Sequence, residues 1–216
     1  MALQKKDFIE IEFTGKIKGG EVFDSNVKKD LEKLNPQANP KPLVFSLGEG
    51  MFLKGVDDFL IGKEVGKYQI ELVPEKAFGP RMKEFIQMVP IKIFGGQNIN
   101  PFPGAVFNFD GRIAKILAVS GGRVTVDFNN PLAGKTVVYD INILKKIEDL
   151  NEKIKSFILF LFRRELNFSV KENKIIIEAE KEMTQFIKMF GEKFKDMFNM
   201  DVEVKEVEKK DSKTQQ

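Results

Sequence analysis

The residue types that this chain lacks limit the chemistry that it can perform. Its 216 residues include no cysteine and no histidine. This composition excludes disulfides, thiolate nucleophiles, histidine-based metal sites and Ser-His-Asp triads. Any chemistry must therefore depend on the shape of a cavity, on carboxylates, on hydroxyls or on backbone groups. We accordingly expect no metal site and no cofactor.

Three short stretches, far apart in the sequence, could together place apolar side chains around a single acid, Asp24. They are residues 20–25, which contain Phe23 and Asp24, residues 47–56, and residues 77–79. We interpret them as the walls of one apolar pocket. Together with the later run 137–141, they resemble the FKBP-type peptidyl-prolyl isomerases in residue type and in order along the chain.

The resemblance implies that the chain accelerates cis–trans isomerisation of X-Pro peptide bonds. Unaided, this rotation crosses a barrier of roughly 18–20 kcal/mol and takes tens to hundreds of seconds. The twisted amide of the transition state has lost its resonance, so its carbonyl is less polar than in the planar ground state. An apolar cavity that excludes water therefore binds the transition state more tightly. No proton transfer is needed, so the reaction is compatible with the absence of histidine and cysteine.

The family's pocket residues can be matched to this sequence one position at a time. The resemblance implies that Asp24 faces the substrate carbonyl and that the backbone N–H of Leu53 donates a hydrogen bond to the substrate. Taken singly, such aromatic residues are more often core than catalytic; their joint occurrence in order favours the pocket. The full set expected to act in catalysis is Phe13, Phe23, Asp24, Leu43, Phe52, Leu53, Val56, Ala77, Phe78 and Tyr139.

Some of these positions depart from the common pattern of the family. Phe13 and Phe78 stand where many members have tyrosine, so two hydroxyl groups that could bind a ligand or orient the acid are absent. Val56 stands where many members have tryptophan, although aliphatic residues there are familiar in the SlyD-like branch. We expect weaker macrolide binding and modest activity. The alternative is a non-catalytic holdase chaperone that retains the fold.

Hydrophobic periodicity predicts the elements that position the pocket. Alternation of apolar and polar residues over 8–14 predicts a half-buried strand, and further strands are expected near 22–23, 43–45, 70–73 and 135–143. Residues 56–61 have helical spacing that stops at Gly62. The proline-rich stretch 26–42 predicts a long irregular connection. With the resemblance, these patterns indicate an α+β fold over 1–79 and 132–148, with an antiparallel FKBP-type sheet wrapped on a short helix.

Residues 80–131 differ in texture, with many prolines and glycines between short β-like runs at 107–109, 113–119 and 124–128. We interpret them as a small β-rich domain inserted into a loop. Segments 85–90 and 127–134 resemble the insert-in-flap domain of SlyD-like isomerases, which implies binding of unfolded polypeptides. The insert is too small to bury all its apolar side chains. Those expected to bind clients, or alternatively to form the insert's own core, are Phe85, Ile86, Met88, Val89, Ile91, Ile93 and Phe94.

From residue 149 the periodicity becomes helical. A helix over 150–161, a hairpin around Glu172 and Asn173, a second helix over 183–198 and a last strand near 202–207 predict an α-β-β-α-β domain over 149–208. A disordered tail is expected at 209–216. The domain resembles the extension of long archaeal FKBP-type chaperones. Because residues 157–162 are apolar nearly all round their helix, we expect a homodimer through this domain. An internal core and a second client-binding surface are the alternatives.

Charge and hydropathy limit the possible partners. The net charge is only +3, and residues 80–131 carry six Lys/Arg against three Asp/Glu, without a concentrated basic stripe. A nucleic-acid or ribosome-associated factor is thus the less favoured alternative, and we expect no nucleic acid. The N-terminus lacks a signal-like run, and no apolar run reaches the roughly 20 residues of a membrane span. We expect a cytoplasmic protein whose partners are X-Pro peptides and unfolded or partly folded polypeptides.

Overall fold

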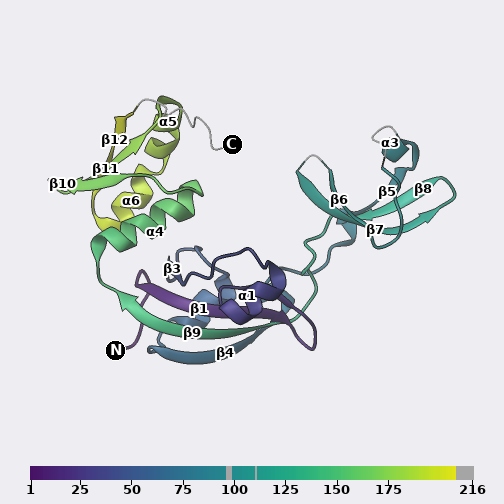
Figure 1. Ribbon diagram of the computed structural model, residues 1–216, viewed down its shortest axis with the longest axis horizontal. Coiled ribbons are helices and arrows are strands. Elements are labelled where there is room, and N and C mark those ends of the chain that lie inside the picture. Colours follow the sequence, from purple (N-terminus) through teal and green to yellow (C-terminus); the bar gives the residue numbers. More distant parts are fainter. Residues whose placement is uncertain (96–98, 110, 208–216) are drawn as a thin grey trace. The chain divides into compact units, whose positions relative to one another are not determined.

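The computed structural model describes residues 1–95, 99–109 and 111–207, and it confirms the α+β class (Figure 1). The tail predicted at 209–216 lies outside the described residues. The chain divides into two compact units. The first unit comprises Met1–Ile11, Pro42–Gly66 and Ile143–Gln216, and the second comprises Glu12–Lys41 and Lys67–Asn142.

The largest sheet has five strands built around two long ones, β1 (Phe8–Ile17) and β9 (Val137–Ile147). Its order is β2-β1-β9-β4, with β3 also paired to β1. The shorter strands are β2 (Val22–Ser25), β3 (Leu43–Ser46) and β4 (Gly66–Leu72). Strand β1 is antiparallel to β2, where Gly15 lies opposite Asp24, and to β3, where Ile11 lies opposite Leu43. The strands expected from alternation are therefore present, most of them longer than predicted.

Two helices accompany this sheet, and one of them was not predicted. Helix α1 (Lys28–Leu34) lies within the stretch expected to be irregular. The first proline of that stretch is Pro36, so residues 28–34 are free to form a helix. Helical conformation is disfavoured at the residue before a proline, so the helix must end near Asn35. Helix α2 (Lys54–Leu60) matches the helical spacing, buries Val56 and Leu60, and is followed by Gly62 with a positive φ of 84°.

The inserted segment has a sheet of its own, as expected for a separate β-rich domain. Its antiparallel order is β5-β8-β7-β6, from β5 (Ile86–Pro90), β6 (Val106–Phe109), β7 (Arg112–Ser120) and β8 (Arg123–Asp127). Two 3-10 turns, Pro74–Lys76 and Lys83–Phe85, precede β5, and the short helix α3 (Lys92–Gly95) follows it. The Gly134 N–H donates to the Gly79 carbonyl at 2.8 Å, so the two ends of the insert lie side by side.

The C-terminal segment begins with α4 (Leu150–Phe162), whose first turn is capped by the Asp149 carboxylate accepting from the Glu152 N–H. Strands β10 (Phe168–Lys171) and β11 (Lys174–Ala179) form the expected hairpin. Glu172 and Asn173 both have positive φ, as a two-residue hairpin turn of type I′ requires. Strand β12 (Asp201–Glu206) pairs in parallel with β11.

One predicted element of this segment differs in the structure. The helix expected over 183–198 is two helices, α5 (Lys181–Met189) and α6 (Gly191–Phe198). Phe190 between them has ψ near 5°, and Gly191, a weak helix former, starts the second helix. The helices bury Phe157, Ile187 and Phe194 together with Ile175 and Ile177 of β11 in one core. None of the helices in the described part of the chain is long and apolar enough to span a bilayer.

Candidate functional site

The second compact unit contains a cluster of aromatic rings centred on Phe23. The Phe23 ring meets the rings of Phe78 and Tyr139 edge-on, with centroids 5.6 and 5.8 Å apart. The Phe13 ring lies 6.1 Å from that of Tyr139. Edge-to-face contacts of this kind stabilise a fixed arrangement of rings beyond the burial of their area. Four of the aromatic residues predicted for the pocket are thus brought together from strands β1, β2 and β9 and from the segment after β4.

The cluster depends on Gly15, a position that the sequence analysis did not select. A Cβ atom at Gly15 would lie 2.9 Å from both Phe23 Cζ and Tyr139 Cε1, closer than carbon atoms normally approach. The rings therefore occupy the space that any side chain at this position would need. A glycine in the interior of a strand is the signal that could have indicated such a close approach.

Asp24 lies on β2 directly opposite Gly15, and so beside the rings. Partial burial raises the pKa of its carboxyl group, and a hydrogen bond from the Ser25 backbone N–H opposes that shift. Burial also raises the pKa of Tyr139, and the negative charge of Asp24 raises it further. The Tyr139 hydroxyl therefore keeps its proton at neutral pH. Asp24 and Tyr139 thus add a carboxyl group and a neutral hydroxyl group to the ring cluster.

A small hydrogen-bond network fixes the start of this site. The Ser25 hydroxyl donates to the Phe13 carbonyl at 3.0 Å and accepts from the Val27 N–H at 3.0 Å. The Asn26 side-chain oxygen accepts from the Phe13 N–H at 2.7 Å. These bonds hold the backbone of Phe13 at a set distance from the end of β2, so they position Asp24 relative to the aromatic rings. Ser25 and Asn26 were not predicted to contribute.

The remaining predicted pocket residues divide between the two units. In the first unit, Val56 is fully buried, the Phe52 ring lies 5.4 Å from that of Phe45, and Leu43 on β3 is half-buried. In the second unit, Ala77 is half-buried and immediately precedes Phe78.

Leu53 stands directly before the first turn of helix α2. Its carbonyl accepts from the N–H groups of Val56 and Asp57 at 2.8 and 3.0 Å. Within the described residues, the Leu53 N–H itself donates to no protein acceptor. An N–H group in that state is available to a bound ligand, which is the role that the resemblance implies for it.

The insert exposes several of the apolar side chains expected to bind clients. Met88 is 68% exposed and Ile93 51%, and Phe85 and Ile91 are exposed as well, whereas Ile86 and Val89 are partly covered. Phe94 is only 1% exposed because it packs into the insert's core. The structure adds exposed apolar residues that the sequence analysis did not select, namely Met82, Phe102, Val106 and Ile113. Among the described residues, no three acidic side chains converge as a metal site would require.

Comparison with known proteins identifies the class to which this chain belongs. A family model described as "FKBP26, IF domain" matches residues 87–132, which cover most of the segment 80–131. The short-type peptidyl-prolyl cis-trans isomerase of Methanocaldococcus jannaschii is 30% identical over 145 residues, which cover 65% of this chain and 92% of that protein. The FKBP-type 16 kDa peptidyl-prolyl cis-trans isomerase of Escherichia coli K12 is 32% identical over 150 residues, covering 67% and 93%.

These similarities show that the chain belongs to the FKBP-type peptidyl-prolyl cis-trans isomerases and is an enzyme of that class. The isomerase SlyD of Aeromonas hydrophila is 30% identical over 138 residues, which cover 62% of this chain and 60% of that protein. Together with the inserted domain, this similarity supports the SlyD-like branch within the family.

Proposed function

We propose that this isomerase is also a folding chaperone, in which the insert binds unfolded polypeptides and presents their X-Pro bonds to the aromatic pocket. In this proposal the domain formed by residues 1–79 and 132–148 catalyses isomerisation, and the domain formed by residues 80–131 binds clients. The expected cytoplasmic location and the pocket assignment of individual residues also stay predictions.

The observation that carries the catalytic part of the proposal is the ring cluster around Phe23. It combines a largely apolar surface with one carboxylate, Asp24, and one neutral hydroxyl, on Tyr139. The resemblance also assigns Phe52, Leu53 and Val56 to catalysis, and we propose that the Leu53 N–H binds a substrate carbonyl. Such a surface would favour the twisted, less polar prolyl amide over the planar one, and lowering the barrier by about 5 kcal/mol gives several thousand-fold acceleration.

The chaperone part is supported by the open face of the insert's sheet. Residues that alternate along its strands face either the core containing Phe94 or the opposite side. Met88 and Ile113, on the side away from that core, are both more than half exposed. An extended client could cover these side chains and pair with an edge strand, β5 or β6. Methionine at such a surface can adapt to many apolar partners.

A proline-limited refolding assay tests both parts together. We expect the wild-type chain to accelerate refolding. Asp24→Ala should slow turnover roughly tenfold, which is equivalent to about 1.4 kcal/mol, and should still suppress aggregation. Deletion of 80–131, closed by a short linker between the adjacent ends, should weaken action on proteins far more than on short peptides. If the wild type suppresses aggregation without accelerating refolding, the chain is instead a non-catalytic holdase.

We also propose that the C-terminal domain forms a homodimer through one apolar patch. The patch consists of Phe186, Met189 and Phe190 on and directly after α5. Met189 is 79% exposed and Phe186 45%. The Phe186 and Phe190 rings lie 5.2 Å apart and both contact Phe162, so the patch is a preformed surface. A second copy of the chain would cover it by the same residues, as a twofold interface requires.

The oligomeric state in solution tests this interface. We expect light scattering on the eluting protein to give twice the chain mass, and Phe186→Glu to give a monomer at the same concentration. Val65→Glu, at an apolar residue exposed to 54% outside the patch, is the matched control and should leave the dimer intact. A monomeric wild type, or dissociation by both variants, would exclude this interface.

A further inference from the structure

A groove at the base of the insert combines an apolar wall with a basic rim. Its volume is about 430 Å³. Val106, Ile113 and Leu117 form part of the wall, and Arg81, Lys115 and Lys135 supply the positive charges. Val106 and Ile113 are each more than half exposed. Clefts of this size accommodate small ligands or a few side chains of a peptide.

Strand register explains why charge and apolar surface meet at this place. Val106 on β6 pairs with Lys115 on β7, and Lys115 pairs with Asp127 on β8. These three side chains therefore form a row across one face of the sheet. β6 is an edge strand, so an extended peptide beside Val106 could also make backbone hydrogen bonds.

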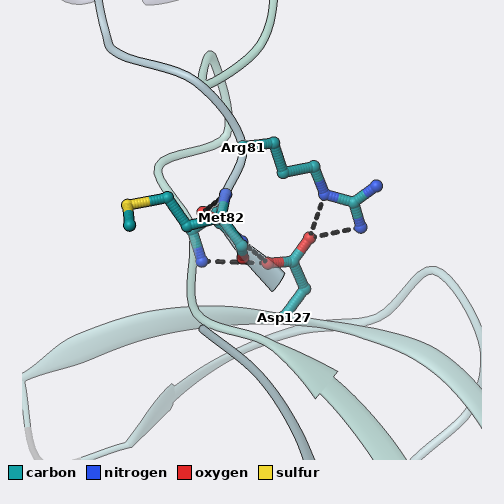
Figure 2. A network of polar contacts seen from close by, with 4 residues as sticks. Arg81, Met82 and Asp127 are labelled. Carbon is teal, nitrogen blue, oxygen red and sulfur yellow. Dashed lines mark hydrogen bonds and ion pairs between the residues drawn. The ribbon is translucent and has the colours of Figure 1, made fainter. Parts of the chain in front are cut away.

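Among the described residues that line the groove, the one acid, Asp127, is already paired with a cation. Arg81 Nε and Nη2 donate to Asp127 Oδ2 at 2.9 and 2.6 Å, as Figure 2 shows. Asp127 Oδ1 accepts from the N–H and the side-chain amide of Asn129, which also bonds both backbone groups of Met82. Burial acts to raise the pKa of Asp127, but the hydrogen bonds from Asn129 and Arg81 outweigh it and hold that pKa below its ordinary value.

In contrast, some of the positive charges that line the groove have no ion-pair partner among the described residues. Within the described residues Arg81 Nη1 donates no hydrogen bond, and the Arg81 side chain is 48% exposed, so Nη1 can donate to a second carboxylate. Within the described part of the chain, Lys115 and Lys135 form no ion pair. The groove thus offers three cations against one paired anion beside exposed apolar side chains.

We infer that this groove selects segments of unfolded polypeptide in which an Asp or Glu adjoins apolar residues. The carboxylate would lie between Arg81, Lys115 and Lys135, and the apolar residues would cover Val106 and Ile113. The inference rests on the proposed client binding by the insert and adds to it a preference among clients. A carboxylate bonded to these cations gains about tenfold in affinity over a neutral amide of the same shape.

Binding of two matched peptides to the full-length protein tests the preference. Both are extended, apolar, free of proline and fluorescently labelled, and they differ only in carrying two Glu or two Gln. Proline-free peptides are not substrates for isomerisation, so their binding reports on the insert. We expect fluorescence anisotropy to show about tenfold tighter binding of the Glu peptide, and the ratio should fall as salt is added.

A matched pair of double variants distinguishes the groove from general charge attraction. The first variant, Lys115→Gln with Lys135→Gln, removes two charges at the groove. The second, Lys92→Gln with Arg123→Gln, removes two exposed charges of the insert that lie outside the groove. Arg123 lies at the opposite end of β8 from Asp127. We expect the first variant to reduce the Glu/Gln ratio to about twofold and the second to keep it. Equal affinities in the wild type, or equal loss in both variants, would overturn the preference while leaving client binding intact. If neither peptide binds, client binding by the insert fails, and the preference fails with it.

Discussion

The close approach of two rings to Gly15 shows how a single residue shapes the ring cluster around Phe23. Phe23 and Tyr139 contact the β1 backbone where a side chain would otherwise stand, and this allows the rings to meet opposite Asp24. The φ of Gly15 is not in the left-handed region, so the requirement for glycine here is steric and not conformational.

Gly15→Ala tests this requirement. The added methyl group must displace the Phe23 or Tyr139 ring, so we expect unfolding in urea to show a loss of about 1–3 kcal/mol. Peptide isomerisation should fall about tenfold, because the rings no longer hold their positions. Gly191→Ala is the control, since nothing lies within 4 Å of its added atom, and it should stabilise α6 slightly. Full activity of Gly15→Ala would contradict the assignment of these rings to the pocket.

Among the elements, helix α2 carries an acid that is costly to ionise. Asp57 is 2% exposed, and its Oδ1 has no hydrogen-bond partner within the described residues. Burial raises its pKa to about 6, with small additions from the charges of Asp58 and Glu49, and hydrogen bonds from the backbone of Gly50 and Gly48 act in the opposite direction. The carboxyl group of Asp57 therefore keeps its proton up to about pH 6, well above the pH at which an ordinary Asp loses it.

The pH dependence of stability follows from this raised pKa. The contribution of Asp57 to the free energy of unfolding is fully present below pH 3.8, and it is lost as the pH rises through about 6. We expect Asp57→Asn to be more stable than the wild type at pH 8, by up to about 3 kcal/mol, and close to it at pH 4. Urea unfolding from pH 4 to 8 measures the difference. Glu75→Gln, at an exposed acid, should show no such trend, and a pH-independent effect of Asp57→Asn would contradict this account.

In the molecule as a whole, the C-terminal segment completes the core of the first unit. Phe8 of β1 stacks on Phe198 at 5.9 Å, and Val44 and Met51 pack against the same core. The Lys6 ammonium donates to the Asp196 carboxylate at 2.9 Å. Met51 immediately precedes Phe52 and Leu53, so the C-terminal segment supports the loop that carries two predicted pocket residues.

Truncation after residue 148 should therefore affect more than dimerisation. It exposes Phe8, which is 2% exposed in the full chain, and removes the partners of Val44 and Met51. We expect urea unfolding to show a loss of about 2–5 kcal/mol, since buried apolar contacts are removed, and peptide isomerisation to fall as well. Deletion of the insert is the control and should leave both nearly unchanged. A truncated chain with full stability and activity would show that the loop needs no such support.

Elements with a local signal could be predicted, and those that depend on distant partners could not. Alternation indicated β1, helical spacing indicated α2 and α4, and the change of texture at residue 80 indicated an insert, whose ends do meet at Gly79 and Gly134. Helix α1 was missed because nearby prolines suggested irregular backbone over the whole stretch. The second C-terminal helix was predicted as one element because the apolar spacing continues across the break at Phe190.

Local pattern reports which side chains are apolar, because periodicity depends only on the order of residues along the chain. It does not report which neighbour covers each of them, because that depends on segments far away in sequence. Phe94 and Met88 look alike in the sequence, yet one fills the insert's core and the other is open to solvent. In the same way, residue order predicts the family's pocket positions, and that assignment stays a prediction, whereas the role of Gly15 and the groove beside Arg81 arise only where separate strands meet.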